Sequence, residues 1–251
     1  MQYSDISTNQ TVKPAGYYQD IPRDEYDAHP GMNASKLKLF QKTTLHALHQ
    51  INRPDNEYNE ALTIGSATHS YILEPELFHK EFFVMKDKIN RRTKEGKAQW
   101  NAALEECGDR GLLRVEHYQT IKRMAESVAR HEVASDLICC GDSEATFFTG
   151  TNYKCRIDKC DTERDLIVDL KTCITADLVS VQQSVRKYHY ALQARHYLNC
   201  YQEVMGRDAR FVFVFVEKAP PHDVNCIELC EGWLGVGQAQ IDKAMNRIAD
   251  M

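Results

Sequence analysis

The chain has 251 residues, of which 43% are hydrophobic and 27% charged, an ordinary composition for a globular protein. Its formal net charge of −5 does not by itself indicate a nucleic-acid-binding protein, although local charge matters more than the sum. No apolar run approaches the roughly 20 residues of a membrane span, and residues 1–16 lack the pattern of a secretory signal, so we expect a cytoplasmic protein.

The nine cysteines do not predict a disulfide framework, because their number is odd and no export signal accompanies them. Their spacing contains no C-x-x-C pair, which disfavours structural zinc and iron–sulfur sites. We therefore expect most of them to be small buried side chains.

The pattern predicts an α/β protein with a polar tail over 1–16 and one domain over 17–251. In the first half, helices are expected over 36–50 and 60–73, a strand over 78–85, and mostly helix over 98–134 with a break at the glycines 108–111. Residues 86–97, KDKINRRTKEGK, form the strongest basic segment, with six basic and two acidic residues. It is either a solvated loop or a contact for a phosphate backbone.

The second half begins with three expected strands over 144–149, 153–160 and 166–171. They are followed by a long helix over 177–201, a buried strand over 210–217, a further strand over 224–229 and a closing helix over 232–249. The chain therefore resembles a meander of three strands embedded between helices.

The central hairpin, YKCRIDKCDTERDLIVDLK, carries the candidate chemistry. Residues two apart in a strand share a face, so Asp169 and Lys171 point the same way, and Asp158 lies opposite Asp169 if the hairpin closes in the obvious register. We expect this group at a sheet edge. Two adjacent carboxylates favour a hard divalent cation such as Mg²⁺ or Mn²⁺, but an exposed surface ion pair is an equally simple explanation.

Two helices carry further candidates. His69 lies four residues after Gly65 on one helix face, although a single histidine there is more often a hydrogen-bonded core residue than a ligand. On the predicted helix 177–201, one stripe is both polar and aromatic, and it suits either packing or contact with a phosphate backbone. Its members are Arg186, Tyr190, Gln193 and Tyr197.

The order of elements, with Asp and Asp-x-Lys on successive strands, resembles the PD-(D/E)xK nuclease core. The helix-borne histidine in GSATH, Glu144 before the hairpin and Gln193-x-x-x-Tyr197 after it are similar to the RecB-like exonuclease branch. The segments NASKLKLF, GSATHSYILEP and RRTKEGK look like RecE-like nuclease domains (exodeoxyribonuclease VIII), of the kind that phages encode. The chain departs from the pattern in having Ile157 before Asp158 and Asp169 where many relatives have Glu.

The resemblance implies a restriction-endonuclease-like fold, a central mixed sheet flanked by helices, and a set of site residues. Asp158, Asp169, His69 and the Leu170 carbonyl would bind Mg²⁺ (with Mn²⁺ as a substitute), and Glu144 would serve a second ion. Lys171 would position or help deprotonate the attacking water, and Gln193 and Tyr197 would hold Lys171 and the phosphate in place. DNA contacts would come from Arg91, Arg92, Lys94, Arg186 and Tyr190.

The implied activity is processive 5′→3′ digestion of one strand at double-stranded DNA ends, which leaves 3′ single-stranded tails for an annealing protein during recombination. Relatives of this kind form rings, so a ring-shaped homo-oligomer is expected. The alternatives are an endonuclease, a CRISPR-associated nuclease of the same fold, and an inactive DNA-binding module. The cysteine spacing disfavours the second, and the presence of Asp158, Asp169 and Lys171 disfavours the third.

Overall fold

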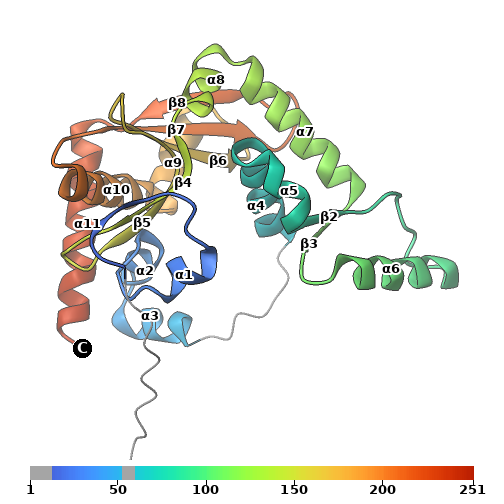
Figure 1. Ribbon diagram of the computed structural model, residues 1–251, viewed down its shortest axis with the longest axis horizontal. Helices are drawn as coiled ribbons and strands as arrows, with labels where there is room; N and C mark the ends of the chain where they lie inside the picture. Colours follow the sequence, from blue (N-terminus) through green and yellow to red (C-terminus); the bar gives the residue numbers. More distant parts are fainter. Residues whose placement is uncertain (1–12, 53–59) are drawn as a thin grey trace, which may run out of the picture.

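The computed structural model describes residues 13–52 and 60–251, and its centre is a six-stranded mixed sheet in the order β1-β4-β5-β6-β7-β8 (Figure 1). Strands β6 and β7 pair in parallel, and the other neighbours pair antiparallel. The strands are β1 (Gly16–Tyr18), β4 (Asp142–Phe148), β5 (Lys154–Asp161), β6 (Leu166–Cys173), β7 (Arg210–Glu217) and β8 (Val224–Glu228). The predicted α/β class with a mixed central sheet is confirmed.

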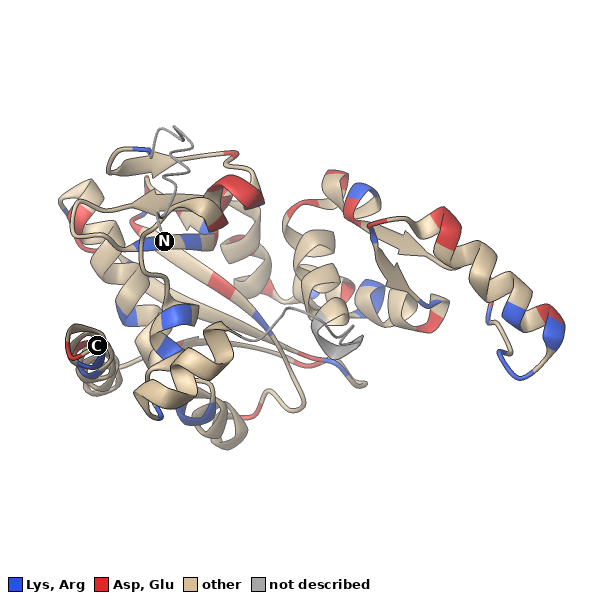
Figure 2. Ribbon diagram, turned by 90° about the horizontal axis from the view of Figure 1, so that it is seen from below, with Lys and Arg blue, Asp and Glu red and all other residues tan. Residues whose placement is uncertain are grey.

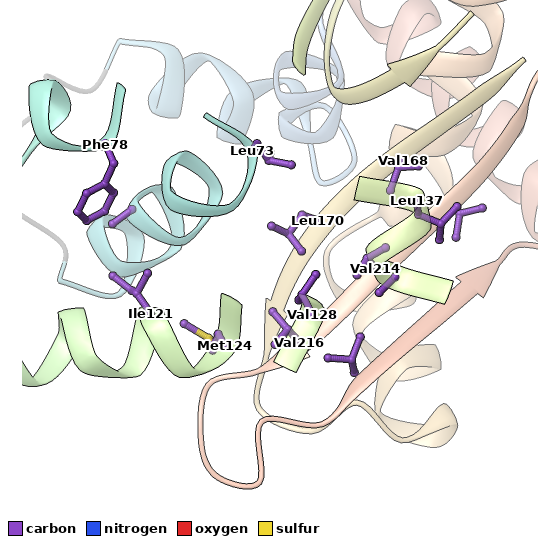
Figure 3. Packing of buried hydrophobic residues seen from close by; sticks show 14 of the residues in the cluster. Leu73, Phe78, Ile121, Met124, Val128, Leu137, Val168, Leu170, Val214 and Val216 are labelled. Atoms are coloured by element: carbon purple, nitrogen blue, oxygen red, sulfur yellow. The ribbon is translucent and has the colours of Figure 1, made fainter. Parts of the chain in front are cut away.

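Helices cover both faces of this sheet. On one face lie α4 (Glu60–Leu73), α5 (Pro75–Glu81), α7 (Val115–Arg130) and α8 (Glu132–Cys139). On the other face lie α9 (Leu178–Lys187), α10 (Tyr190–Met205) and α11 (Glu231–Ala249). The alternation of β7, RFVFVFVE, divides its side chains between the two cores, with valines toward the first face and phenylalanines toward the second. Figure 3 shows the first core, where Leu170 and Val214 meet the helices.

Because both faces are covered, β6 is buried along most of its length. Leu166, Val168 and Leu170 enter the first core, and Ile167 enters the second. The expectation that the Asp-x-Lys strand lies at a sheet edge is therefore wrong, since β6 is an inner strand between β5 and β7. Polar side chains on such a strand must find partners inside the protein.

A small arm extends from the main body (Figure 1). It contains a two-stranded parallel sheet, β2 (Phe82–Val84) with β3 (Gly111–Leu113), and helix α6 (Lys94–Cys107). The predicted strand over 78–85 is mostly wrong. Pro75 is the first residue of helix α5, a position that favours proline, and the chain becomes extended only at Phe82. The predicted glycine break is confirmed, since α6 ends at Cys107 and β3 begins at Gly111.

Two predicted long helices are each divided in two. The helix expected over 36–50 is α2 (Ala34–Leu39) followed by α3 (Thr44–Ile51), because the Thr43 side chain caps a new helix by accepting from the His46 N–H. The helix expected over 177–201 is α9 followed by α10, because His189 adopts a left-handed conformation with φ of 53°. Residues 17–30, before these helices, contain part of β1 and helix α1 (Arg23–Ala28).

Residues 1–12 of the predicted tail lie outside the described residues, and β1 begins at Gly16. All nine cysteines are free, as expected, but only Cys107, Cys155, Cys160 and Cys200 are buried. Among the described helices, none has the length and apolar character needed to cross a membrane.

The contact between α10 and α11 requires a glycine. A Cβ at Gly237 would lie 2.2 Å from the Ala191 carbonyl oxygen, whereas a Cβ at Gly235 would meet no atom within 4 Å. We expect Gly237→Ala to lower the free energy of unfolding by about 1–3 kcal/mol, because α11 must shift. Gly235→Ala on the same helix should be neutral or stabilising by up to about 1 kcal/mol. Urea unfolding of both variants measures this, and equal effects would contradict the packing described.

Candidate active site

The site begins where β5 and β6 separate. Their ladder runs from Asp161↔Leu166 to Lys159↔Val168, so Asp158 and Asp169 are the next facing residues, as the sequence predicts. Here the Asp158 carboxylate accepts a hydrogen bond from the Leu170 backbone N–H at 2.8 Å. The carboxylate is thus fixed against the neighbouring strand and lies beside Asp169.

Asp169 is completely buried, with 0% of its surface exposed. Its carboxylate forms an ion pair with Lys171 and accepts a hydrogen bond of 2.5 Å from the Gln193 side-chain amide. Burial raises the pKa of Asp169, and the Lys171 ammonium acts against this rise. A buried carboxylate therefore depends on the cation two residues further along the same strand.

Lys171 is held from several sides. Its ammonium lies 5.3 Å from the centroid of the Tyr190 ring and 6.0 Å from that of Phe213. Burial by itself would lower the pKa of Lys171, but the carboxylates of Asp169 and Asp158 outweigh burial and raise it. Lys171 is therefore an ammonium at neutral pH, suited to stabilising negative charge.

His69 reaches the site from α4, with its Nδ1 3.3 Å from the Asp158 carboxylate. Gly65, one turn earlier, lines the same cleft. The structure thus brings the predicted helix face to the predicted hairpin, which local sequence alone could not establish.

Gln193 and Tyr197 extend from α10 toward the same strand. The Gln193 Nε2 lies 2.5 Å from Asp169 and 3.4 Å from the Tyr197 hydroxyl. The resemblance implies that Gln193 helps to hold Lys171 in place, and its hydrogen bond goes to Asp169, the partner of Lys171. Burial raises the pKa of Tyr197 well above its usual value, so its hydroxyl remains protonated.

Lys38, on α2, belongs to this group although no sequence pattern singled it out. Its ammonium donates to the Gln193 Oε1 at 2.8 Å and lies 5.4 Å from the Tyr190 ring centroid. Burial, together with the nearby Lys171 ammonium, lowers the pKa of Lys38 to about 7. The partner lies 155 residues away in sequence, so local spacing contains no signal for the contact.

The Gln193 amide is oriented by its two neighbours. A carboxylate can only accept a hydrogen bond, so the amide nitrogen faces Asp169, and its oxygen then faces the Lys38 donor. Rotating the amide by half a turn would place its oxygen against the Asp169 carboxylate and its N–H groups against the Lys38 N–H groups. Lys38 therefore fixes Asp169 through Gln193.

Glu144 lies on β4 next to this centre. The register Ser143↔Lys159 and Ala145↔Ile157 places it opposite Asp158, yet its backbone is left-handed, with φ of 49°. Such a conformation is costly for a non-glycine residue and is often found at functional sites. Its carboxylate pairs with Arg156 at 2.9 Å, and burial, followed by the charge of Asp158, raises its pKa to about 7.

A cleft with a volume of about 1360 Å³ lies beside this group of residues. His69, Asp158, Glu144, Tyr190 and Tyr197 line its wall. Helices α2, α4 and α9 also contribute lining residues, so strands and helices distant in sequence enclose one space.

Of the predicted DNA-binding residues, Tyr190 lies at the cleft and the other four lie elsewhere. Arg91 stacks on Trp100 at 4.2 Å, beside Arg92, around a separate cavity of about 540 Å³ on the arm. Lys94 begins α6 on that arm, where basic residues gather toward the end (Figure 2). The Arg186 guanidinium lies over Trp233, 5.5 Å from the ring centroid. The predicted continuous stripe on one helix is therefore wrong, since Arg186 and Gln193 belong to different helices.

The donor chemistry of this centre fits a hard divalent cation. Asp158 and Asp169 supply carboxylate oxygens from adjacent strands, and a buried carboxylate with a raised pKa is stabilised in its ionised form by a cation. Within residues 13–52 and 60–251, no three His, Cys, Asp or Glu side chains converge into a complete metal site. An ion here would compete with Lys171 and Gln193 for Asp169, and the Leu170 carbonyl and His69 remain candidate ligands.

Fold, strand order and the Asp158/Asp169/Lys171 set together define a PD-(D/E)xK domain with the architecture of a nuclease. The chain belongs to the family described as PDDEXK-like domain of unknown function (DUF3799), whose profile matches residues 33–251. This membership confirms the resemblance to RecE-like nucleases at the level of superfamily and fold. No curated protein sequence matches the chain significantly.

The solved structures that are similar to this chain include two named as exonucleases. A protein from Eubacterium rectale described as a "Putative exonuclease" aligns with a TM-score of 0.65 and 18% identity, over 92% of this chain and 86% of that chain. A "phage related exonuclease" from Haemophilus somnus 129PT aligns with a TM-score of 0.38 and 13% identity, over 86% and 92%. The first likeness supports the fold.

Metal binding can be measured without substrate. We expect Mg²⁺ or Mn²⁺, added to EDTA-treated protein at about 100 times its dissociation constant, to raise the melting temperature by about 5–10 °C, because binding to the folded state contributes about 2.7 kcal/mol. Asp169→Asn should lose this rise. Asp161→Asn, at the far end of β5 and paired with Arg164, is the matched control and should retain it. Equal shifts in all three proteins would contradict a metal site at Asp169.

Proposed function

We propose that this chain is a divalent-metal-dependent deoxyribonuclease, most specifically a Mg²⁺-dependent exonuclease acting on ends of double-stranded DNA. The observation that carries the proposal is the convergence of His69, Asp158, Asp169 and Lys171 at one point, where His69 and Asp158 line the cleft and Asp169 and Lys171 lie behind its wall. Asp169 is buried and Lys171 is nearly so. Burial of charged groups costs desolvation free energy, so their presence inside the protein indicates a functional or structural role.

The chemistry follows from these groups. A bound divalent cation, held by Asp158 and Asp169 with His69 and the Leu170 carbonyl as candidate ligands, would polarise the phosphodiester and offset the carboxylate charge. The Lys171 ammonium can hydrogen-bond a phosphate oxygen or the attacking water and stabilise the charge that develops on phosphorus oxygens. Its raised pKa favours this role over proton removal. Gln193 keeps Asp169 in place, and Tyr197 can donate from its protonated hydroxyl.

The finer activity rests on the resemblance to RecE-like nucleases. Digestion would run 5′→3′ and leave 3′ single-stranded tails for an annealing protein in recombination, and a ring of identical subunits would provide processivity. The similar structure from Eubacterium rectale is named "Putative exonuclease", which is compatible with an exonuclease but does not address polarity or assembly. The alternatives are an endonuclease, a CRISPR-associated nuclease or an inactive DNA-binding module of the same fold.

The direct test uses a linear duplex with one 5′-phosphate end and one 5′-hydroxyl end, incubated with wild type and Asp169→Asn. We expect nucleotide release in Mg²⁺, none in EDTA, and a loss of at least about 100-fold in the variant, because Asp169 holds both Lys171 and the candidate metal. Asp161→Asn controls for loss of a carboxylate on the same hairpin. Cleavage of covalently closed circles would favour the endonuclease, and no hydrolysis by folded protein that binds DNA would overturn the enzyme proposal.

Lys38 gives a second test of the same mechanism. Lys38→Met retains the length of the side chain but removes the donor to Gln193, so Asp169 loses its fixed partner. We expect kcat to fall about 10- to 100-fold with little change in KM, because small displacements of catalytic groups are costly. Lys38→Arg should restore part of the rate. A change confined to KM would instead make Lys38 a substrate contact.

A further inference from the structure

One wall of the cleft differs from the rest in its chemistry. Helix α9 contributes Ser180, Gln183, Ser184 and Lys187 to the lining. At 3.6 residues per turn, these four positions fall within an arc of about 100° on one side of the helix. They are called here the α9 donor face, because each side chain can donate a hydrogen bond.

The other sides of α9 have different roles. Val181 and Val185 are buried in the core beneath the sheet, and Arg186 lies over Trp233. The sequence of α9, LVSVQQSVRK, contains no acidic residue, and Lys187 stands at its end. The N-cap residue Asp177 accepts hydrogen bonds from the Val179 and Ser180 backbone N–H groups, so one carboxylate lies at the N-terminal end of the donor face. From Gln183 to Lys187 the face carries no acidic side chain.

Acidic side chains reach the cleft from other elements. They come from the segment before α1, from α4–α5, from β4 and from β5, and comprise Asp20, Glu74, Glu81, Glu144 and Asp158. The basic lining residues Arg23 and Arg156 are paired with the carboxylates of Asp27 and Glu144. Lys187, at the end of α9, and Lys218, whose backbone N–H bonds to Cys173 at the end of β6, also line the cleft. A phosphodiester chain is repelled by the carboxylates and attracted by these two ammonium groups. Charge within the cleft thus favours one path for a nucleic-acid backbone, along α9.

Two exposed apolar side chains accompany this path. Ile174, three residues after Lys171, is 86% exposed, and Tyr188, at the end of α9, is 47% exposed, and both line the cleft. Flat or apolar side chains beside an ammonium group suit unpaired bases, whose faces are hidden in a duplex. Ile174 lies on the connection between β6 and α9, and Tyr188 caps the other end of α9.

We propose that the α9 donor face binds the sugar–phosphate backbone of a single-stranded DNA segment adjoining the scissile phosphate, with Ile174 and Tyr188 against its bases. The inference rests on the proposed nuclease function and specifies how its substrate lies. Base stacking and backbone contacts of this kind do not read sequence.

The test measures binding of a fluorescein-labelled oligothymidine in EDTA, where hydrolysis is absent, across a range of salt concentrations. Lys187→Gln should weaken binding and reduce the slope of log affinity against log salt by about 0.7, because one phosphate contact is lost. Tyr188→Ala should weaken binding about tenfold without changing the slope, because it removes stacking. Lys122→Gln on α7, outside the cleft, is the matched control and should change neither.

Two further measurements test the assigned path and the preference for a single strand. Glu81→Gln, which removes an acid from the cleft, should bind as well as wild type or better, and weakening equal to that of Lys187→Gln would overturn the assigned path. A covalently closed duplex should bind less tightly than the oligothymidine, and equal loss of affinity for both in Lys187→Gln would overturn the single-strand assignment. Melting temperatures establish that each variant is folded.

The outcomes separate this inference from the proposed function. If the oligothymidine results hold but the protein hydrolyses no DNA in Mg²⁺, the nuclease proposal fails and the binding surface stands. If hydrolysis occurs and Lys187→Gln matches Lys122→Gln in affinity and in kcat/KM, the surface is wrong and the nuclease stands.

Discussion

The structure of the site depends on the buried pairing of Asp169 with Lys171. A carboxylate with no exposed surface lies on an inner strand between two apolar cores, and it retains its charge only because an ammonium and an amide reach it. Removing one member of such a pair typically costs about 3–5 kcal/mol, because an uncompensated charge remains inside. The helices around β6 provide the polar partners that these two residues and their neighbours require.

Three helices supply these partners. Helix α10 brings Gln193, helix α2 brings Lys38 to orient it, and helix α4 brings His69 to the neighbouring Asp158. Each contact is made by a side chain from an element that also packs into a core, so the apolar packing fixes the polar geometry. The left-handed residue His189 separates α9 from α10, and each of the two helices contributes its own side chains to the cleft.

The cleft is also divided by charge. Carboxylates gather near β4 and α4–α5, while α9 offers donors and an ammonium. A site that must hold both a cation and a polyanion benefits from this division, since the two ligands attract each other but require opposite protein charges. The net charge of −5 is compatible with a nucleic-acid substrate for this reason, because the sum conceals the local distribution.

The sequence by itself determined the elements with strong local signals. The alternation in RFVFVFVE predicted a buried strand, the hairpin placed Asp158 opposite Asp169, and the helix bearing His69 ends where expected, at Leu73. These features depend on periodicity and register, which neighbouring residues encode. The superfamily followed from the order and spacing of such signals.

Only the tertiary structure decided which polar groups meet. The contact of Lys38 with Gln193, the pairing of Glu144 with Arg156 and the turn of Arg186 toward Trp233 join residues whose positions depend on helix breaks and on packing across the sheet. The burial of Asp169 had the same origin, since an inner strand and an edge strand can share one local sequence pattern. Long-range packing carries no periodic signal, so it could be known only once the chain was folded.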